Sequence, residues 1–194
     1  GLKTFSVGFH ATGGESGDEF EYSDLIAEHF DTDHQQILVD PHRMLPAVDA
    51  AITAMAEPMV SHDCVAFYLL SEEVAKSVKV VQSGQGADEV FAGYSWYAPL
   101  AEVPRVRAVP AYARVFTDRP HDDLANILEP EWLLPEDPSR AFVAAHFARA
   151  GATESLDAAL RIDSTIMLVD DPVKRVDNMT MAWGLEARVP FLDH

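Results

Sequence analysis

The fold is decided by VKVVQSGQGADEVFAGY, residues 78–94, which predicts a strand, a glycine loop and a helix start in direct succession. The β-branched residues Val78, Val80 and Val81 favour a strand in the interior of a sheet. Two glycines follow, spaced one residue apart, and the helix that comes next begins with acidic side chains. The stretch therefore predicts a buried strand that leads into a loop at one end of a sheet.

The predicted loop suits an anion and a metal ion. Gly84 and Gly86 have no Cβ, so backbone N–H groups can face outward. If residues 87–94 form a helix, its first N–H groups and its dipole add to this cradle. Asp88, in the first turn, offers a hard oxygen ligand for Mg²⁺. Phosphate held by backbone groups and metal held by a carboxylate is the chemistry of a nucleotide site.

Taken alone, this pattern also fits an ordinary tight turn whose acidic residues merely favour a helix start. A P-loop is excluded, because the chain contains no G-x-x-x-x-G-K-[ST] pattern. A nucleophile elbow at Ser83 would need glycine at position 81, where Val81 stands. The sequence therefore argues against a serine hydrolase and leaves the tight turn as an alternative to the nucleotide site.

A second stretch, residues 170–194, reads DDPVKRVDNMTMAWGLEARVPFLDH. Together with SGQGADEVFAGY, residues 83–94, it closely resembles the synthetase domain of the asparagine synthetase family, the glutamine-hydrolysing, ATP-dependent amide synthetases. The resemblance begins at residues 4–8 and continues to the end of the chain, with a weak match from about residue 99 to residue 162. Two long motifs in the order of the family make the resemblance specific.

The alternation of strands and helices in the first half predicts an α/β fold, a parallel sheet flanked by helices on both faces. The resemblance implies the adenine nucleotide alpha hydrolase-like type, also called the PP-loop ATP pyrophosphatase type, followed by a mainly helical C-terminal part. We expect residues 1–95 to form a partial α/β nucleotide-binding core and residues 96–194 to form the helical part of the same synthetase domain. The chain reads as a fragment: the resemblance implies an upstream S-G-G-x-D-S pyrophosphate loop and an N-terminal glutaminase domain outside it.

Periodicity and capping signals predict the individual elements. The predicted elements are a strand at 2–9, a loop at 10–18, a helix around 20–30, a strand at 35–39, a helix that begins with Asp40 as N-cap and Pro41, a helix capped by residues 61–63, short helices joined by turns from Trp96, helices at 140–150 and 154–169, and a last helix that starts at Asp171-Pro172 and ends at Gly184. Ligands of open parallel sheets bind beyond the carboxyl ends of the strands, so the glycine loop and Val7 should share one pocket.

The resemblance implies that a carboxylate is activated as an acyl-adenylate by ATP, with release of pyrophosphate, and is then amidated by ammonia. By the same resemblance, Val7 backbone groups lie at the adenine, and Ser83, Gly84 and Gly86 hold the nucleotide. Asp88 is the expected metal ligand, with a solvated helix-start carboxylate as the alternative. The implied cofactors are ATP and Mg²⁺.

Two positions depart from the family pattern. Gln85 stands where asparagine-forming members usually carry glutamate, and a glutamine cannot accept a proton as a general base. It either orients an intermediate or indicates an acceptor other than free aspartate. Asn178 stands where members often place a basic residue, so Lys174 and Arg175 become candidate cations for pyrophosphate, unless they are exposed charges on a solvated face. We therefore assign Gln85, Lys174 and Arg175 to the catalytic set.

Composition limits the partners. Lys plus Arg number 14 and Asp plus Glu 32, a net charge of −18, which argues against nucleic acid and anionic membranes. The single cysteine excludes an internal disulfide and fits a reducing compartment, so we expect a cytoplasmic protein. The expected partners are ATP, aspartate or another carboxylate, ammonia from glutamine and the glutaminase domain of the same polypeptide, with a homodimer left open.

A few further residues have structural readings. Glu89 is expected to support the glycine loop, and Trp183 to belong to the core. Cys64 reads as a small buried neighbour of a helix cap, without signs of activation. Glu186 and Arg188 fit a structural ion pair as well as a substrate contact.

Overall fold

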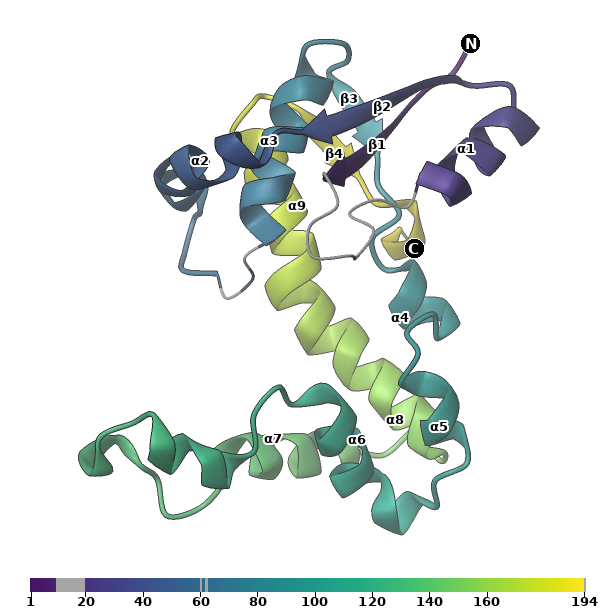
Figure 1. The fold of residues 1–194 in the computed structure, drawn as a ribbon. Coiled ribbons are helices and arrows are strands. Elements are labelled where there is room, and N and C mark those ends of the chain that lie inside the picture. The colour runs from purple at the N-terminus through teal and green to yellow at the C-terminus, as the bar shows by residue number, and fades with distance from the viewer. Residues whose placement is uncertain (10–19, 60, 62, 194) are drawn as a thin grey trace. The chain divides into compact units, whose positions relative to one another are not determined.

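The computed structural model describes residues 1–9, 20–59, 61 and 63–193 (Figure 1). These residues form two compact units. The first unit consists of residues 1–83 and 171–193, and the second of residues 84–170. These units are defined by how the backbone packs, not by what each part binds. The expected division at residue 95 into a nucleotide-binding core and a helical part therefore stays a prediction. The loop predicted at residues 10–18 lies outside the described residues.

The first unit begins with a β-α-β segment. Strand β1 (Lys3–Phe9) and strand β2 (Asp33–Val39) pair in parallel, with Val7 opposite Ile37. Helix α1 (Phe20–His29) connects them and contacts both strands. The predicted strands, the predicted helix and the parallel pairing are confirmed here.

The strand that leads into the glycine loop is shorter and less buried than predicted. Strand β3 (Val80–Gln82) pairs in parallel with β4 (Glu186–Arg188), and β4 is its only hydrogen-bonded neighbour among the described residues. The expectation of a buried interior strand is wrong at Val80, whose side chain is 48% exposed. Branching at Cβ favours a strand backbone, but burial depends on what covers each face, and here Val80 lies in a two-stranded sheet.

Helices α2 and α3 cover the described core of the first unit. Helix α2 (Pro41–Ala54) begins as predicted, with the Asp40 carboxylate accepting from the His42 N–H at 2.8 Å. Helix α3 (Asp63–Ala75) begins beside Ser61, whose Oγ accepts from the Asp63 N–H at 3.2 Å. The buried core of the first unit includes Val39, Ala47, Ala51, Cys64, Val65, Leu69 and Met179. The Cys64 reading as a buried neighbour of the cap is therefore confirmed.

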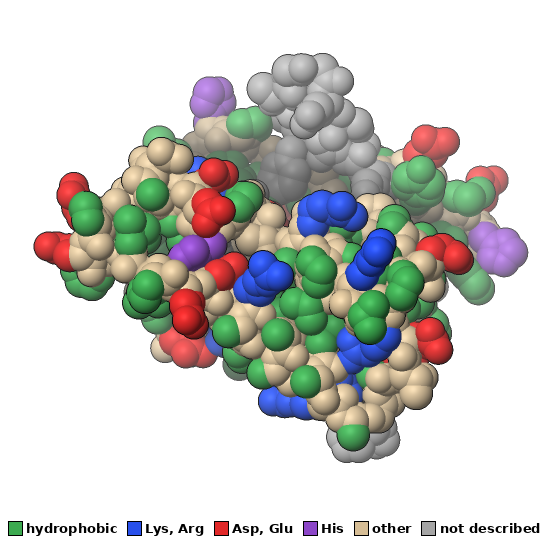
Figure 2. All heavy atoms as spheres, turned by 90° about the horizontal axis from the view of Figure 1, so that it is seen from below, with side chains coloured by type: hydrophobic (Ala, Val, Ile, Leu, Met, Phe, Trp, Pro, Cys, Tyr) green, Lys and Arg blue, Asp and Glu red, His purple; other side chains and the backbone are tan. Residues whose placement is uncertain are grey.

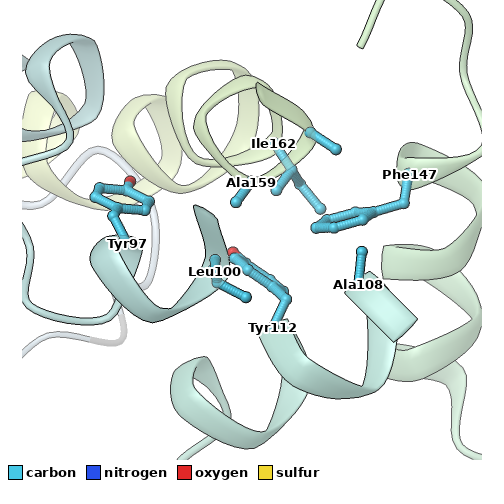
Figure 3. Close-up of a cluster of buried hydrophobic side chains, with 8 residues drawn as sticks. Tyr97, Leu100, Ala108, Tyr112, Phe147, Ala159 and Ile162 are labelled. Atoms are coloured by element: carbon cyan, nitrogen blue, oxygen red, sulfur yellow. The ribbon is translucent and has the colours of Figure 1, made fainter. Parts of the chain in front are cut away.

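The second unit consists of short helices, as the proline-rich sequence predicts. Its elements are α4 (Ala87–Phe91), α5 (Tyr97–Ala101), η1 (Arg105–Arg107), α6 (Ala108–Phe116), η2 (His121–Asn126), η3 (Pro130–Trp132), α7 (Pro138–Phe147), α8 (Ser155–Ile162) and the π-helical segment η4 (Asp163–Met167). Side chains from α5, α6, α7 and α8 meet in one core (Figure 3). The members of this core are Tyr97, Leu100, Ala108, Tyr112, Phe147, Ala158, Ala159 and Ile162.

Helix α7 differs from the helix predicted at residues 140–150. It begins at Pro138, because the Asp137 carboxylate accepts from the Arg140 N–H at 3.0 Å. The helix ends at Phe147, earlier than predicted, and Gly151, which follows four residues later, has φ 99°. The Asp-Pro pair at 137–138 was the sequence signal for the earlier start.

The start predicted for the last helix at Asp171-Pro172 is wrong. Pro172 lies inside a second π-helical segment, η5 (Val169–Val173), and α9 (Lys174–Met181) follows without a break. Proline lacks an N–H and clashes with the carbonyl four residues earlier in an α-helix. Around Pro172 the backbone follows a wider turn with i→i+5 hydrogen bonds, and the helix continues through the proline into α9.

The C-terminal end of the described chain agrees better with the prediction. The chain leaves α9 near Gly184, which has φ 62°. Trp183 is half-buried, and its ring packs against the Tyr68 ring with the centroids 5.1 Å apart, as expected of a core residue. After β4, a short 3-10 helix, η6 (Pro190–Leu192), is the last described element.

Charged side chains of both signs lie on the face of the molecule drawn in Figure 2. On the face drawn in Figure 2, basic side chains lie among hydrophobic ones, although the chain has a net charge of −18. Among the described residues, no helix has both the length and the apolar composition needed to span a bilayer.

Candidate functional site

The glycine loop forms a tight turn. The Gly84 carbonyl accepts from the Ala87 N–H at 3.2 Å. Gly86 has φ 92° and ψ −12°, the backbone of the third position of a type II turn, where a side chain would be strained. Gly84 is exposed and Gly86 is buried. The two glycines thus have different roles, because only Gly86 needs the left-handed conformation.

Not all backbone amides of the loop face outward as predicted. The Ser83 N–H donates to the Arg188 carbonyl at 2.8 Å and thereby prolongs the pairing of β3 with β4. The Ala87 N–H is used inside the turn. Within the described chain, the N–H groups of Gly84, Gln85 and Gly86 have no acceptor. Three consecutive amides therefore remain for an anion.

Helix α4 is shorter than the predicted helix at 87–94. It ends at Phe91, because Ala92 takes a left-handed conformation with φ 57°. The Gly93 N–H then donates back to the Asp88 carbonyl at 2.9 Å and closes the helix. With one turn and a half, α4 contributes little dipole, so the turn amides carry more of any anion binding than the helix does.

The two acidic residues of α4 face opposite ways. Asp88 is exposed to solvent. Glu89 is 1% exposed, and its Oε1 accepts from the Tyr94 hydroxyl at 2.8 Å. Its Oε2 is buried and has no hydrogen-bond partner among the described residues. This orientation fits the supporting role expected of Glu89 and leaves Asp88 available to a ligand.

The remaining predicted residues belong to the first unit. Val7 is half-buried in β1, where it packs against the core formed with α2 and α3. Ser83 is the last residue of the first unit, directly before Gly84. A pocket shared by Val7 and Asp88 stays a prediction.

Lys174 and Asn178 lie one turn apart on α9. Lys174 Nζ lies 2.6 Å from Glu57 Oε1. Asn178 Nδ2 donates to the Lys174 carbonyl at 2.7 Å, and its Oδ1 accepts from the Ala56 N–H at 2.7 Å. A lysine or arginine side chain carries no hydrogen-bond acceptor and could not accept from the Ala56 N–H. This hydrogen bond is a structural reason for asparagine at position 178.

Arg175 is 8% exposed and ties α9 to the start of α3. Its Nη1 donates to Ser61 Oγ at 2.9 Å and to Asp63 Oδ2 at 3.1 Å. Its guanidinium also lies over the Phe67 ring, 5.0 Å from the centroid. The alternative of exposed charges on a solvated face is therefore wrong for Arg175. The proposed contact with pyrophosphate stays a prediction for both cations.

The second unit contains a buried polar cluster that was not predicted from the sequence. Asp163 is fully buried and accepts hydrogen bonds from the hydroxyls of Tyr97, at 2.6 Å, and Tyr112. Loss of solvation raises the pKa of the Asp163 carboxyl, and the nearby Glu89 adds to the rise. The signal was present, because Asp163 falls on the same helical face as Leu160 and Ile166.

The second unit also contains a cavity of about 750 Å³ between α6, η2, η3 and α7, with Arg114, Arg140 and Trp132 in its lining. None of the predicted site residues lines this cavity. Among the described residues, no group of three or more His, Cys, Asp and Glu side chains is placed to hold a metal. Within the described part of the chain, Asp88 therefore belongs to no preformed cluster of metal ligands.

The sequence matches a family model described as asparagine synthase over residues 1–194. Asparagine synthetase 1 (glutamine-hydrolyzing) of Bacillus subtilis strain 168 is 24% identical over 228 residues, covering 99% of this chain and 35% of that protein. The human asparagine synthetase (glutamine-hydrolyzing) is 25% identical over 199 residues, covering 100% of this chain and 25% of that protein.

A putative asparagine synthetase (glutamine-hydrolyzing) 2 of Methanocaldococcus jannaschii is 31% identical over 114 residues, which cover 59% of this chain and 21% of that protein. The chain thus spans 35% or less of the length of each of these three relatives. Because the family model covers every residue, the chain belongs to the asparagine synthase family.

Proposed function

We propose that the polypeptide containing this chain converts a carboxylate, with aspartate as the first candidate, into its amide. The carboxylate oxygen attacks the α-phosphorus of ATP, an acyl-adenylate forms and pyrophosphate leaves. Ammonia derived from glutamine then attacks the activated carbonyl carbon, and AMP leaves as the amide forms. The observation that carries the proposal is the family match over the whole chain, which includes both motifs.

The turn at residues 84–87 supports a role in nucleotide binding. Its three consecutive amides at Gly84, Gln85 and Gly86, which find no acceptor among the described residues, form a concentration of donors suited to phosphate oxygens. In our proposal Ser83 contributes its side chain, because its N–H is already bonded to β4. Val7 would contribute backbone groups to the adenine from β1.

Asp88 fits the proposed magnesium site. Mg²⁺ is commonly bound through one or two carboxylates together with substrate phosphates and water. The donor set here, one exposed carboxylate beside three amides that suit phosphate, corresponds to that arrangement. When bound, Mg²⁺ neutralises charge on the leaving pyrophosphate. Asp88 would be the carboxylate that holds the ion, while Lys174 and Arg175 are the candidate cations for pyrophosphate.

A second candidate function is amidation of a different carboxylate by the same chemistry. Gln85 favours it, because an amide between the two glycines can donate and accept hydrogen bonds but cannot take up a proton. In that case Gln85 orients the acyl-adenylate, and the substrate differs from aspartate in the group that faces position 85.

Pyrophosphate release by the full-length protein tests these candidates. The assay uses ATP, Mg²⁺ and ammonia with aspartate, with a panel of other carboxylates, or with none, and an Asp88→Ala variant serves as the control. Aspartate-dependent release supports asparagine synthesis, and release only with another acid supports the second candidate. If no carboxylate elicits release while ATP still binds, the protein is a non-catalytic nucleotide-binding module and the proposal fails.

A further inference from the structure

Gly93 has no role in the proposed chemistry, although it belongs to the same motif as Asp88. Its φ does not lie in the left-handed region, in contrast to Gly86 and Gly184. Backbone conformation therefore does not require glycine at position 93. The requirement must come from the space around its Cα.

That space is filled by Asp88. A Cβ built on Gly93 would lie 2.0 Å from Asp88 Oδ1, 3.0 Å from its Cγ and 3.1 Å from its Cα. The first distance is far inside van der Waals contact, so any larger residue at position 93 must displace the carboxylate. The added Cβ would collide less severely with the Asp88 Cα than with its carboxylate. The Gly93 N–H donates to the Asp88 carbonyl at 2.9 Å, and this hydrogen bond holds the two residues next to each other.

The neighbouring residue holds the other side of α4. Tyr94 donates its hydroxyl to Glu89, the buried residue directly after Asp88. Because Glu89 is anchored inside the second unit, α4 cannot rotate to carry Asp88 away from Gly93 without breaking this bond. Gly93 thus leaves room beside its Cα for the Asp88 carboxylate, and Tyr94 holds α4 in place through its hydrogen bond to Glu89.

We propose that Gly93 is a positioning residue for Asp88: because it has no Cβ, it leaves room for the carboxylate beside its own Cα while α4 stays anchored through Glu89 and Tyr94. The steric part of this inference concerns the protein alone. Its functional part rests on the proposed role of Asp88 as a magnesium ligand. Gly93→Ala would then weaken metal binding without removing any ligand atom.

The steric part is tested by a double-mutant cycle in the full-length protein. Urea unfolding midpoints are measured for the wild type, Gly93→Ala, Asp88→Ala and the double variant. We expect Gly93→Ala to lower the midpoint of the transition that contains α4, and to lower it much less in the Asp88→Ala background, where the colliding carboxylate is absent. Equal losses in both backgrounds would overturn the steric inference, because the new methyl group would then be colliding with something else.

The functional part is tested by Mn²⁺ binding, followed by the electron paramagnetic resonance of free Mn²⁺ in the presence of ATP. We expect Gly93→Ala to weaken Mn²⁺ binding roughly ten-fold, the lower end of the effect of losing a residue that orients a metal ligand. It should have no further effect in the Asp88→Ala background. Ala92→Gly is the matched control, because Ala92 has φ 57° and its change adds no atom near Asp88.

The outcomes separate the two levels of argument. If Asp88→Ala weakens Mn²⁺ binding and Gly93→Ala does not, the positioning role is wrong while the proposed function stands. If neither variant changes Mn²⁺ binding, Asp88 is not the metal ligand, and the proposed site fails together with the functional part. Equal weakening by Gly93→Ala and Ala92→Gly would also overturn the positioning role, because it would reflect general damage to the turn.

Discussion

Within the described part of the chain, the Glu89 side chain has one hydrogen bond, which the Tyr94 hydroxyl donates to Oε1. We predict that Tyr94→Phe lowers the free energy of unfolding by about 1–3 kcal/mol, because a buried polar group then loses its partner. Urea denaturation measures the change. Tyr22→Phe is the control, since Tyr22 is 70% exposed. If the two variants lose the same stability, the bond does not anchor α4.

We predict that the free energy of unfolding depends on pH through the buried Asp163 carboxyl. Burial raises the pKa of its carboxyl, despite the hydrogen bonds from Tyr97 and Tyr112. The folded state therefore binds the proton more tightly than the unfolded state, and the stability falls as pH rises from the unfolded pKa, about 4, through the folded pKa. Asp163→Asn should remove this part of the decline. Unfolding free energies measured over this pH range decide the point, and an unchanged slope in the variant would contradict it.

At the scale of single residues, burial separates the two acids of α4: Asp88 is exposed and Glu89 is buried, which fits the supporting role predicted for Glu89, while the metal-binding role of Asp88 stays a prediction. The need for glycine at position 93 could not be recognised, because it depends on where the Asp88 side chain lies. Asp163 could have been noticed as an acid on an apolar helix face, but its two tyrosine partners are 66 and 51 residues away in sequence.

At the scale of elements, α9 is tied to α3 by Arg175. We predict that Arg175→Ala lowers the free energy of unfolding by about 2 kcal/mol, since the charge-assisted bonds to Ser61 and Asp63 are lost. Lys174→Ala is the control, and its loss should stay below about 1 kcal/mol, because the partner Glu57 is 59% exposed. Chemical denaturation compares the two. Equal losses would show that Arg175 contributes no more than a surface charge.

Two Asp-Pro pairs show how far local signals reach. Asp40-Pro41 begins α2 as predicted, with the Asp40 side chain capping the first turn. Asp171-Pro172 is the same signal, yet it lies at a π-helical turn that runs into α9. Whether a side chain can cap a helix start depends on the few residues next to it, and these are visible in the sequence. Whether a preceding helix stops is decided by packing along its whole length, which the pair itself does not encode.

At the scale of the whole molecule, the chain covers 35% or less of the length of the Bacillus subtilis, Methanocaldococcus jannaschii and human relatives. We predict that the 194-residue chain alone shows little or no aspartate-dependent AMP formation, because the proposed reaction also needs a pyrophosphate loop and a source of ammonia. The assay supplies free ammonia, so that only the synthetase step is required. AMP formation at the rate of the full-length protein would contradict the prediction.

The π-helical segment η4 has a consequence for the evolution of the family. A π turn has the geometry of an α-helix that has received one extra residue while the flanking turns keep their phase. Removing one residue between Asp163 and Met167 should therefore restore a continuous α-helix without reorienting α8. Aligned homologues whose helix is α-helical throughout this stretch are expected to show a one-residue gap at this place.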